Sequence, residues 1–378
     1  MQKRFLSLLF IVALFSSINA IAQPYVGSKQ LLDSNENELY LRFESTLFLK
    51  DNEYNNPYTE GGMNIGFIVK PTLEYYITKT TRVNLGVHVL QFAGRDGFTQ
   101  AIPIFTVQQR LLKGLDLVMG SFYSTNTHNM EEAIFEMDRY FKNNIEYGGQ
   151  LLYHSKYFDG DAWLNWETHI MKDDPFQEKF QMGISTNLKF DFNKFKIRIP
   201  LQLYTMHNGG QIDSDPAPAT SYFNGVTGFR FIYEFNKNNA LSFEPLVLRY
   251  KALRMPDTGQ YAYPFREGEA YYFKLKYSNK YIRAMVGYWY ARAFIAPKGE
   301  YLFQSVSNYQ PNYSQKYRKM IPFKLILNYP VSKYVNIQIR TDNYYDIMTT
   351  KIDHTYSLYI TINDAFFLTK VKRKPENR

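Results

Sequence analysis

Residues 63–78 read Met-Asn-Ile-Gly-Phe-Ile-Val-Lys-Pro-Thr-Leu-Glu-Tyr-Tyr-Ile-Thr. Its odd positions, from Met63 to Ile77, are mostly apolar, whereas most of its even positions are polar or glycine. Because successive side chains of a strand point to opposite faces, the pattern predicts a strand with one apolar and one mostly polar face. The alternation returns in residues 180–192 and 195–203. These runs exceed the usual strand length of about 5–6 residues.

Sixteen such runs follow one another along the chain. They cover residues 39–49, 63–77, 82–92, 101–110, 115–123, 145–154, 161–171, 179–192, 194–206, 226–236, 240–251, 269–278, 281–291, 318–329, 334–341 and 355–364. Short connections alternate with longer ones, and the clearest long ones cover 50–62, 124–144, 207–225, 252–268, 292–317 and 342–354. In an up-and-down meander every second turn lies at the same end, so one end has tight turns and the other has long loops. An even number of strands also places both termini at the tight-turn end.

This pattern resembles the Gram-negative outer-membrane β-barrels, and specifically a porin-like barrel of sixteen strands. The resemblance implies an all-β fold: a closed antiparallel transmembrane β-barrel with an up-and-down meander, in the outer membrane and surrounded by its lipid. A secreted β-sandwich or propeller is the alternative, but such folds are built from shorter strands.

The two ends of the chain differ in composition from the barrel. Residues 1–22 combine a basic start, an apolar run and a small-residue cleavage site, which predicts a secretory signal peptide. We expect residues 23–35 to form a periplasmic lead-in, residues 36–368 the barrel, and residues 369–378 a basic tail.

Composition excludes several classes of function. The chain has no Cys, which excludes disulfides and thiol catalysis. Much of its net charge of +9 lies near the two ends, so we expect no nucleic-acid partner. The His residues show no metal-binding spacing, and we expect neither a metal nor another cofactor.

Charged residues on the inward face predict a pore. The candidates for the pore lining are Lys189, Lys196, Arg198, Arg230, Arg82 and Glu74. Basic groups outnumber acidic ones on this face, and rings of basic side chains favour anions. We therefore expect a porin-like channel for passive diffusion of small polar or anionic solutes, with a constriction near Lys189, Lys196 and Arg198. The alternative is that these charges pair across strands and only solvate the interior. Homo-oligomerisation is left open.

Two long loops suggest additional roles. Residues 129–141 show helical spacing of Ala133, Ile134, Met137 and Phe141, which predicts a short helix that narrows the mouth of the barrel. Residues 294–317 are rich in tyrosine, and a surface-binding barrel could use them to capture a glycan or a partner protein.

An enzyme that acts on lipid at the barrel rim is a further alternative. Its candidate site is His207 as a base, with Asp213 to orient it and Ser214 as the nucleophile. Outer-membrane phospholipases show a His-x-Ser-Asn-Gly pattern, whereas here Gly209 stands two residues after His207. A Gly-Gly pair also supplies the turn that opens a long loop. We therefore expect that the chain is not an enzyme.

Overall fold

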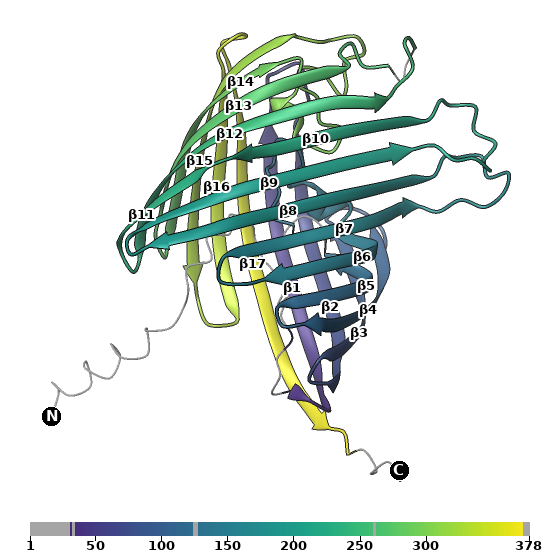
Figure 1. The fold of residues 1–378 in the computed structure, drawn as a ribbon, viewed down its shortest axis with the longest axis vertical. Helices are drawn as coiled ribbons and strands as arrows, with labels where there is room; N and C mark the ends of the chain where they lie inside the picture. Colours follow the sequence, from purple (N-terminus) through teal and green to yellow (C-terminus); the bar gives the residue numbers. More distant parts are fainter. Residues whose placement is uncertain (1–30, 32–34, 124–127, 260–261, 373–378) are drawn as a thin grey trace.

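The computed structural model describes residues 31, 35–123, 128–259 and 262–372. Within these residues one antiparallel sheet contains seventeen strands, and the order of pairing closes it into a barrel (Figure 1). The strands are β1 (Glu38–Glu53), β2 (Gly62–Thr78), β3 (Thr81–Phe92), β4 (Gln100–Leu112), β5 (Leu115–Tyr123), β6 (Ile145–His154), β7 (Phe158–Thr168), β8 (Lys179–Phe192), β9 (Phe195–Asn208), β10 (Thr220–Gly228), β11 (Arg230–Asn236), β12 (Asn239–Arg254), β13 (Glu267–Ser278), β14 (Ile282–Arg292), β15 (Tyr317–Pro330), β16 (Val335–Asp346) and β17 (Lys351–Lys370). The described helices are α1 (Arg139–Lys142) and the 3-10 turn η2 (Tyr301–Phe303).

Two of these strands, β10 and β11, are halves of a single strand of the barrel wall. Both β10 and β11 pair with β9 on one side and with β12 on the other. The break falls at Gly228, whose φ of +153° suits glycine and whose missing side chain lets the Pro245 carbonyl approach. Phe229 N–H then bonds to Pro245 O at 3.1 Å. The barrel wall therefore has sixteen strands, which confirms the predicted fold.

The first and last strands close the barrel. β1 pairs with β2 on one edge and with β17 on the other, and Glu38 lies opposite Lys370. The start of β1 and the end of β17 are therefore neighbours, as the even strand number predicts. The predicted signal peptide of residues 1–22 and most of the lead-in lie outside the described residues, and β17 runs two residues past the predicted barrel boundary at 368.

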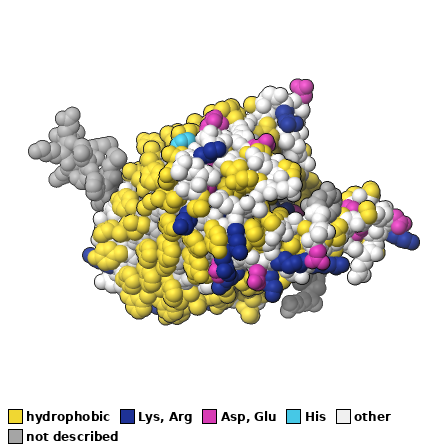
Figure 2. Space-filling model, turned by 90° about the horizontal axis from the view of Figure 1, so that it is seen from above, with side chains coloured by type: hydrophobic (Ala, Val, Ile, Leu, Met, Phe, Trp, Pro, Cys, Tyr) yellow, Lys and Arg dark blue, Asp and Glu magenta, His cyan; other side chains and the backbone are white. Residues whose placement is uncertain are grey.

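Strand alternation produces an apolar outer face. Along β8 the outward positions, such as Met182 and Ile184, are exposed, while Gln181 and Ser185 are buried inside. Figure 2 shows hydrophobic side chains over much of the side of the barrel. Such a band is what a membrane barrel presents to acyl chains. Among the described residues, no helix is long and apolar enough to cross a bilayer.

The loops differ from expectation in two places. The predicted long loop 342–354 is mostly strand, because β16 and β17 extend until only residues 347–350 connect them. The predicted helix over 129–141 is largely wrong, because only α1 is helical. Residues 128–142, which we call the plug segment, instead follow an irregular path inside the barrel, since their side chains bind strands on several sides of the wall. The main hydrophobic core joins this segment to residues 293–306 and to inward side chains of β10 and β12–β16.

Candidate functional site

All six predicted pore-lining residues are found in polar pairs on the inward face. Arg42 bonds Glu74 at 2.7 Å, and Arg82 donates to Gln108 at 2.7 Å. The other four pairs are Arg230–Glu244 at 2.8 Å, Lys189–Asp159 at 2.7 Å, Lys196–Glu234 at 2.5 Å and Arg198–Asp191 at 2.6 Å. Lys189, Lys196 and Arg198 lie beside the short β8–β9 turn, so they are remote from the external loops that fill the lumen.

The plug segment is fixed to the wall by acidic side chains. Glu131 pairs with Lys274 of β13 at 2.7 Å, Glu132 pairs with Lys324 of β15, and Asp138 pairs with Lys50 of β1. Although burial alone would raise it, the Lys50 ammonium holds the pKa of the Asp138 carboxyl below its usual range. The segment therefore spans the lumen, with contacts on well-separated strands.

A second loop folds inward against the plug segment. Phe294, Ile295 and Phe303 of this loop are fully buried. Glu136 N–H bonds to Lys298 O at 2.7 Å, and Glu300 N–H bonds to Glu132 O at 2.9 Å. The first half of the tyrosine-rich loop 294–317 therefore packs into the barrel.

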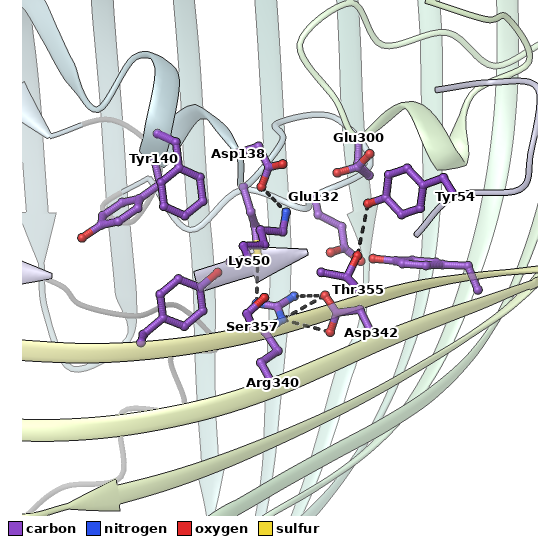
Figure 3. A pocket seen from close by; sticks show the side chains of 14 residues that line it. Lys50, Tyr54, Glu132, Asp138, Tyr140, Glu300, Arg340, Asp342, Thr355 and Ser357 are labelled. Atoms are coloured by element: carbon purple, nitrogen blue, oxygen red, sulfur yellow. Dashed lines mark hydrogen bonds and ion pairs between the residues drawn. The ribbon is translucent and has the colours of Figure 1, made fainter. Parts of the chain in front are cut away.

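A small cavity remains between these loops and the wall formed by β1, β16 and β17 (Figure 3). Its volume of about 20 Å³ has room for little more than one water molecule. Asp138, Glu132 and Glu300 point into it together with Lys50 and Arg340. Burial, followed by the charge of Asp138, raises the pKa of Glu300 to about 7. The space that the side chains leave here is too small to hold a lipid.

His128 begins the plug segment and has the partners of a catalytic histidine. Its Nδ1 lies 3.0 Å from Asp161, its Nε2 lies 3.4 Å from Glu146, and its ring stacks on Trp163 with centroids 3.6 Å apart. Although burial opposes it, the Asp161 charge raises the pKa of His128. The ring is sealed inside the core, where both nitrogens face carboxylates rather than a nucleophile. We therefore assign it an anchoring role, which the sequence pattern did not reveal.

A different arrangement occupies the outer face at the external end of β7–β12. Cross-strand register aligns Trp166 with Phe180, Phe180 with His207, and His207 with Ser221. Directly opposite residues share a face of the sheet. This face is the outer one, because the neighbouring positions Tyr204, Tyr222 and Asn224 are buried inside the barrel. We call the four aligned residues Trp166, Phe180, His207 and Ser221 the rim row.

The rim row contains a hydrogen-bonded histidine and serine. Ser221 Oγ lies 2.7 Å from His207 Nδ1, and His207 Nε2 lies 3.1 Å from the carbonyl oxygen of Gly209. A carbonyl can only accept, so Nε2 carries the proton and Nδ1 is left to accept the serine proton. The His207 ring also packs on Phe180, with centroids 4.9 Å apart. This is the geometry of a base beside a nucleophile, with the base oriented by a third group.

The other two members of the sequence-predicted rim site lie elsewhere. Ser214 Oγ donates within hydrogen-bond reach of the Asp173 and Asp174 carbonyls, at 3.1 and 3.2 Å. Asp213 accepts from Asp215 N–H at 3.2 Å. Within the described part of the chain, no hydrogen bond joins either residue to His207. Sequence reasoning missed Ser221 because the tenth run was placed at 226–236, whereas the strand begins at Thr220 and brings Ser221 opposite His207.

Comparison with known proteins gives a family and a fold. The family model described as "Lipid A 3'-O-deacylase-type" matches residues 31–371. No curated protein matches the chain in sequence. The crystal structure of the outer membrane protein OprD from Pseudomonas aeruginosa is similar with a TM-score of 0.53 and 10% identity, over 90% of this chain and 96% of that one. An improved OprD structure gives a TM-score of 0.51 and 11% identity, over 89% and 97%.

A closed barrel with an apolar outer band is the architecture of an outer-membrane protein, and the comparisons confirm the resemblance to porin-like barrels in fold. They also correct one prediction. The expectation that the chain is not an enzyme is wrong, because the matching family is named for an enzymatic activity.

Proposed function

The chain belongs to the lipid A 3'-O-deacylase-type family, and from that premise we propose that it hydrolyses an acyl ester of an outer-leaflet lipid at the rim row. The observation that carries the proposal is the 2.7 Å hydrogen bond between Ser221 Oγ and His207 Nδ1 on the outer face. Lipids of the outer leaflet reach this face laterally. Lipid A is the substrate that the family name indicates.

The chemistry follows from the two side chains. His207 Nδ1 accepts the hydroxyl proton while Ser221 Oγ attacks the ester carbonyl carbon. The proton on His207 then passes to the departing alcohol oxygen, which leaves an acyl-serine. Water attacks this acyl group while His207 takes its proton; the acyl–serine bond then breaks, His207 returns the proton to Ser221 Oγ, and the fatty acid is released. The Gly209 carbonyl keeps the imidazole in the tautomer that this sequence needs.

Arg254 supports an anionic substrate. It lies opposite Ser221 across the β10–β12 pair, at a register shift between the two strands. Its guanidinium is exposed, and no ion pair to it is found among the described residues. A free guanidinium beside the nucleophile suits a phosphorylated lipid headgroup, which it can bind bidentately.

Mutation of the pair tests the proposal directly. Purified barrel in vesicles containing lipid A is assayed for released fatty acid by mass spectrometry. Ser221→Ala should abolish release, and His207→Ala should lower it by about 10²–10⁴-fold because general-base assistance is lost. Ser214→Ala is the matched control and should keep wild-type activity. Wild-type turnover by Ser221→Ala would refute the assignment, and a loss in Ser214→Ala alone would restore the original serine candidate.

Diffusion of small polar solutes is a second candidate function. A sixteen-stranded barrel is wide enough for an aqueous channel, and the inward face here is polar. The plug segment opposes it, because its contacts span the lumen. Planar-bilayer recordings decide between the two: channel events from the wild-type protein would support diffusion, and a silent wild type with active ester hydrolysis would support the enzyme.

A further inference from the structure

Two external loops beside the rim row form one projecting structure. Residues 169–178 connect β7 to β8, and residues 209–219 connect β9 to β10. They bond to each other through Asp173 N–H to Ile212 O at 2.7 Å and Ser214 N–H to Asp174 O at 2.8 Å. We call the pair the ledge. Figure 1 shows it extending beyond the other loops at the ends of β7–β10.

The base of the ledge is tightly packed. Gly209 has a φ of +131° and donates its N–H to Glu178 O at 2.9 Å. The side chain of Ile170 is buried against Gly210, where any side chain on that glycine would collide with it. The predicted role of the Gly-Gly pair in opening the loop is therefore seen at Gly209. The ledge is held at a fixed position relative to His207.

The outer part of the ledge exposes large apolar side chains. Met171 is 69% exposed, Phe176 is 44% exposed and Ile212 is 49% exposed. Single exposed apolar residues are ordinary, but three on one small projection form a surface that water solvates poorly. Figure 2 shows hydrophobic side chains on this lobe among acidic and basic ones. Mixed apolar and charged side chains suit the headgroup boundary of a membrane.

The ledge is continuous with the surface that faces lipid. It rises from the strands that carry Trp166, Phe180 and His207, and Trp166 and Phe180 stack with ring centroids 5.4 Å apart. Aromatic pairs at this level mark the membrane interface of a barrel. We propose that the ledge lies on the outer leaflet and holds the acyl chains of the lipid whose ester is presented to Ser221. The second half of this statement rests on the proposed function, whereas the lipid contact does not.

Lipid contact is measured without reference to activity. The chain has no Cys, so a single introduced cysteine gives one labelled site. Met171→Cys and Ile212→Cys are labelled with a small fluorophore in nanodiscs made with acyl-brominated lipids. Both labels should be quenched. Gln310→Cys, an exposed position in the loop over the barrel mouth, is the control and should not be. Quenching at 171 and 212 no stronger than at 310 would overturn the lipid contact.

The role of the ledge in positioning the lipid is tested by comparing hydrolysis of two substrates. The triple variant Met171→Ser, Phe176→Ser, Ile212→Ser should hydrolyse bilayer lipid at least about tenfold more slowly, since lost apolar burial weakens lipid capture. Hydrolysis of a water-soluble short-chain ester should be unchanged, which also shows that the variant is folded. Equal loss on both substrates, or on neither, would overturn positioning. The failures are distinguishable: an active Ser221→Ala refutes the proposed function, while unquenched ledge labels with an inactive Ser221→Ala refute only the ledge.

Discussion

Asp138→Asn should loosen the plug segment more than any other single neutralisation of its acids. The reason is whether the cation paired with each acid keeps another ion-pair partner once that acid is neutralised. Lys274 still has Glu244 at 3.0 Å when Glu131 is neutralised. Lys50 forms its one ion pair within the described residues with Asp138, and its side chain is buried. Removing one partner of a buried pair costs about 3–5 kcal/mol, and the lower end applies because an asparagine oxygen still accepts a hydrogen bond.

The expected difference is measurable by hydrogen exchange. A cost of about 3 kcal/mol raises the open population of the segment roughly 150-fold, whereas Glu131→Gln, which loses about 1.5 kcal/mol, raises it roughly tenfold. Exchange of a peptide covering 128–142 reports this population, because Tyr140 N–H and Phe141 N–H are held by local bonds of 3.0 Å. Peptides from β8 serve as the internal reference. Equal exchange in the two variants, or exchange at the wild-type rate in Asp138→Asn, would refute the reasoning.

Three further outcomes are expected. The Glu300 carboxyl has a folded pKa of about 7, above its unfolded value, so its stabilisation of the plug segment is complete below about pH 4.5 and is lost as the pH rises through 7. Hydrogen exchange of 128–142, corrected for the intrinsic effect of pH on exchange, should be faster at pH 8.5 than at pH 5.5, with a smaller difference in Glu300→Gln; equal rates at the two pH values would contradict this. Arg254→Gln should lower hydrolysis of anionic lipid by about tenfold at low salt and leave a neutral ester unaffected, with the gap closing as salt screens the charge; equal loss on both substrates would argue against phosphate binding. A barrel whose residues 129–141 are replaced by a Gly/Ser linker should show a modest preference for anions in reversal-potential measurements. The double substitution Lys196→Glu, Arg198→Glu should weaken or reverse that preference, whereas unchanged selectivity would place the controlling charges elsewhere.

The barrel was predictable because strand geometry leaves a direct trace in sequence. A period of two over ten or more residues has few explanations, and fifteen connections of alternating length fix the two ends. The prediction lost accuracy where the alternation of apolar and polar residues stops before the strand does. Residues 342–346 continue β16, yet Asp342 and Asn343 are adjacent polar residues and read as a loop.

The candidate site was only half predictable, because it depends on register. His207 was found as the residue that follows a long run at the outer end. Its partner Ser221 lies fourteen positions later, after a loop, and only the pairing of β9 with β10 brings the two within 2.7 Å. Ser214, the serine named from the sequence, is nearer to His207 along the chain, but the fold does not bring the two together. The irregular path of the plug segment was not predicted for a similar reason. Glu131, Glu132 and Asp138 are close in sequence, but their cationic partners come from three separate strands.

A filled lumen and an outward-facing site are consistent with each other. An enzyme that takes its substrate from the outer leaflet does not need a pore. A sixteen-stranded barrel with an empty lumen would leave an open aqueous path across the membrane. A different set of inward cations holds the plug segment in the lumen, since Lys274, Lys324 and Lys50 bind its acids. The polar inner face therefore serves as the attachment surface for a folded-in loop. The outer face, where His207 and Ser221 interrupt an apolar and aromatic surface with a polar pair, is where the chain departs from what a simple membrane barrel requires.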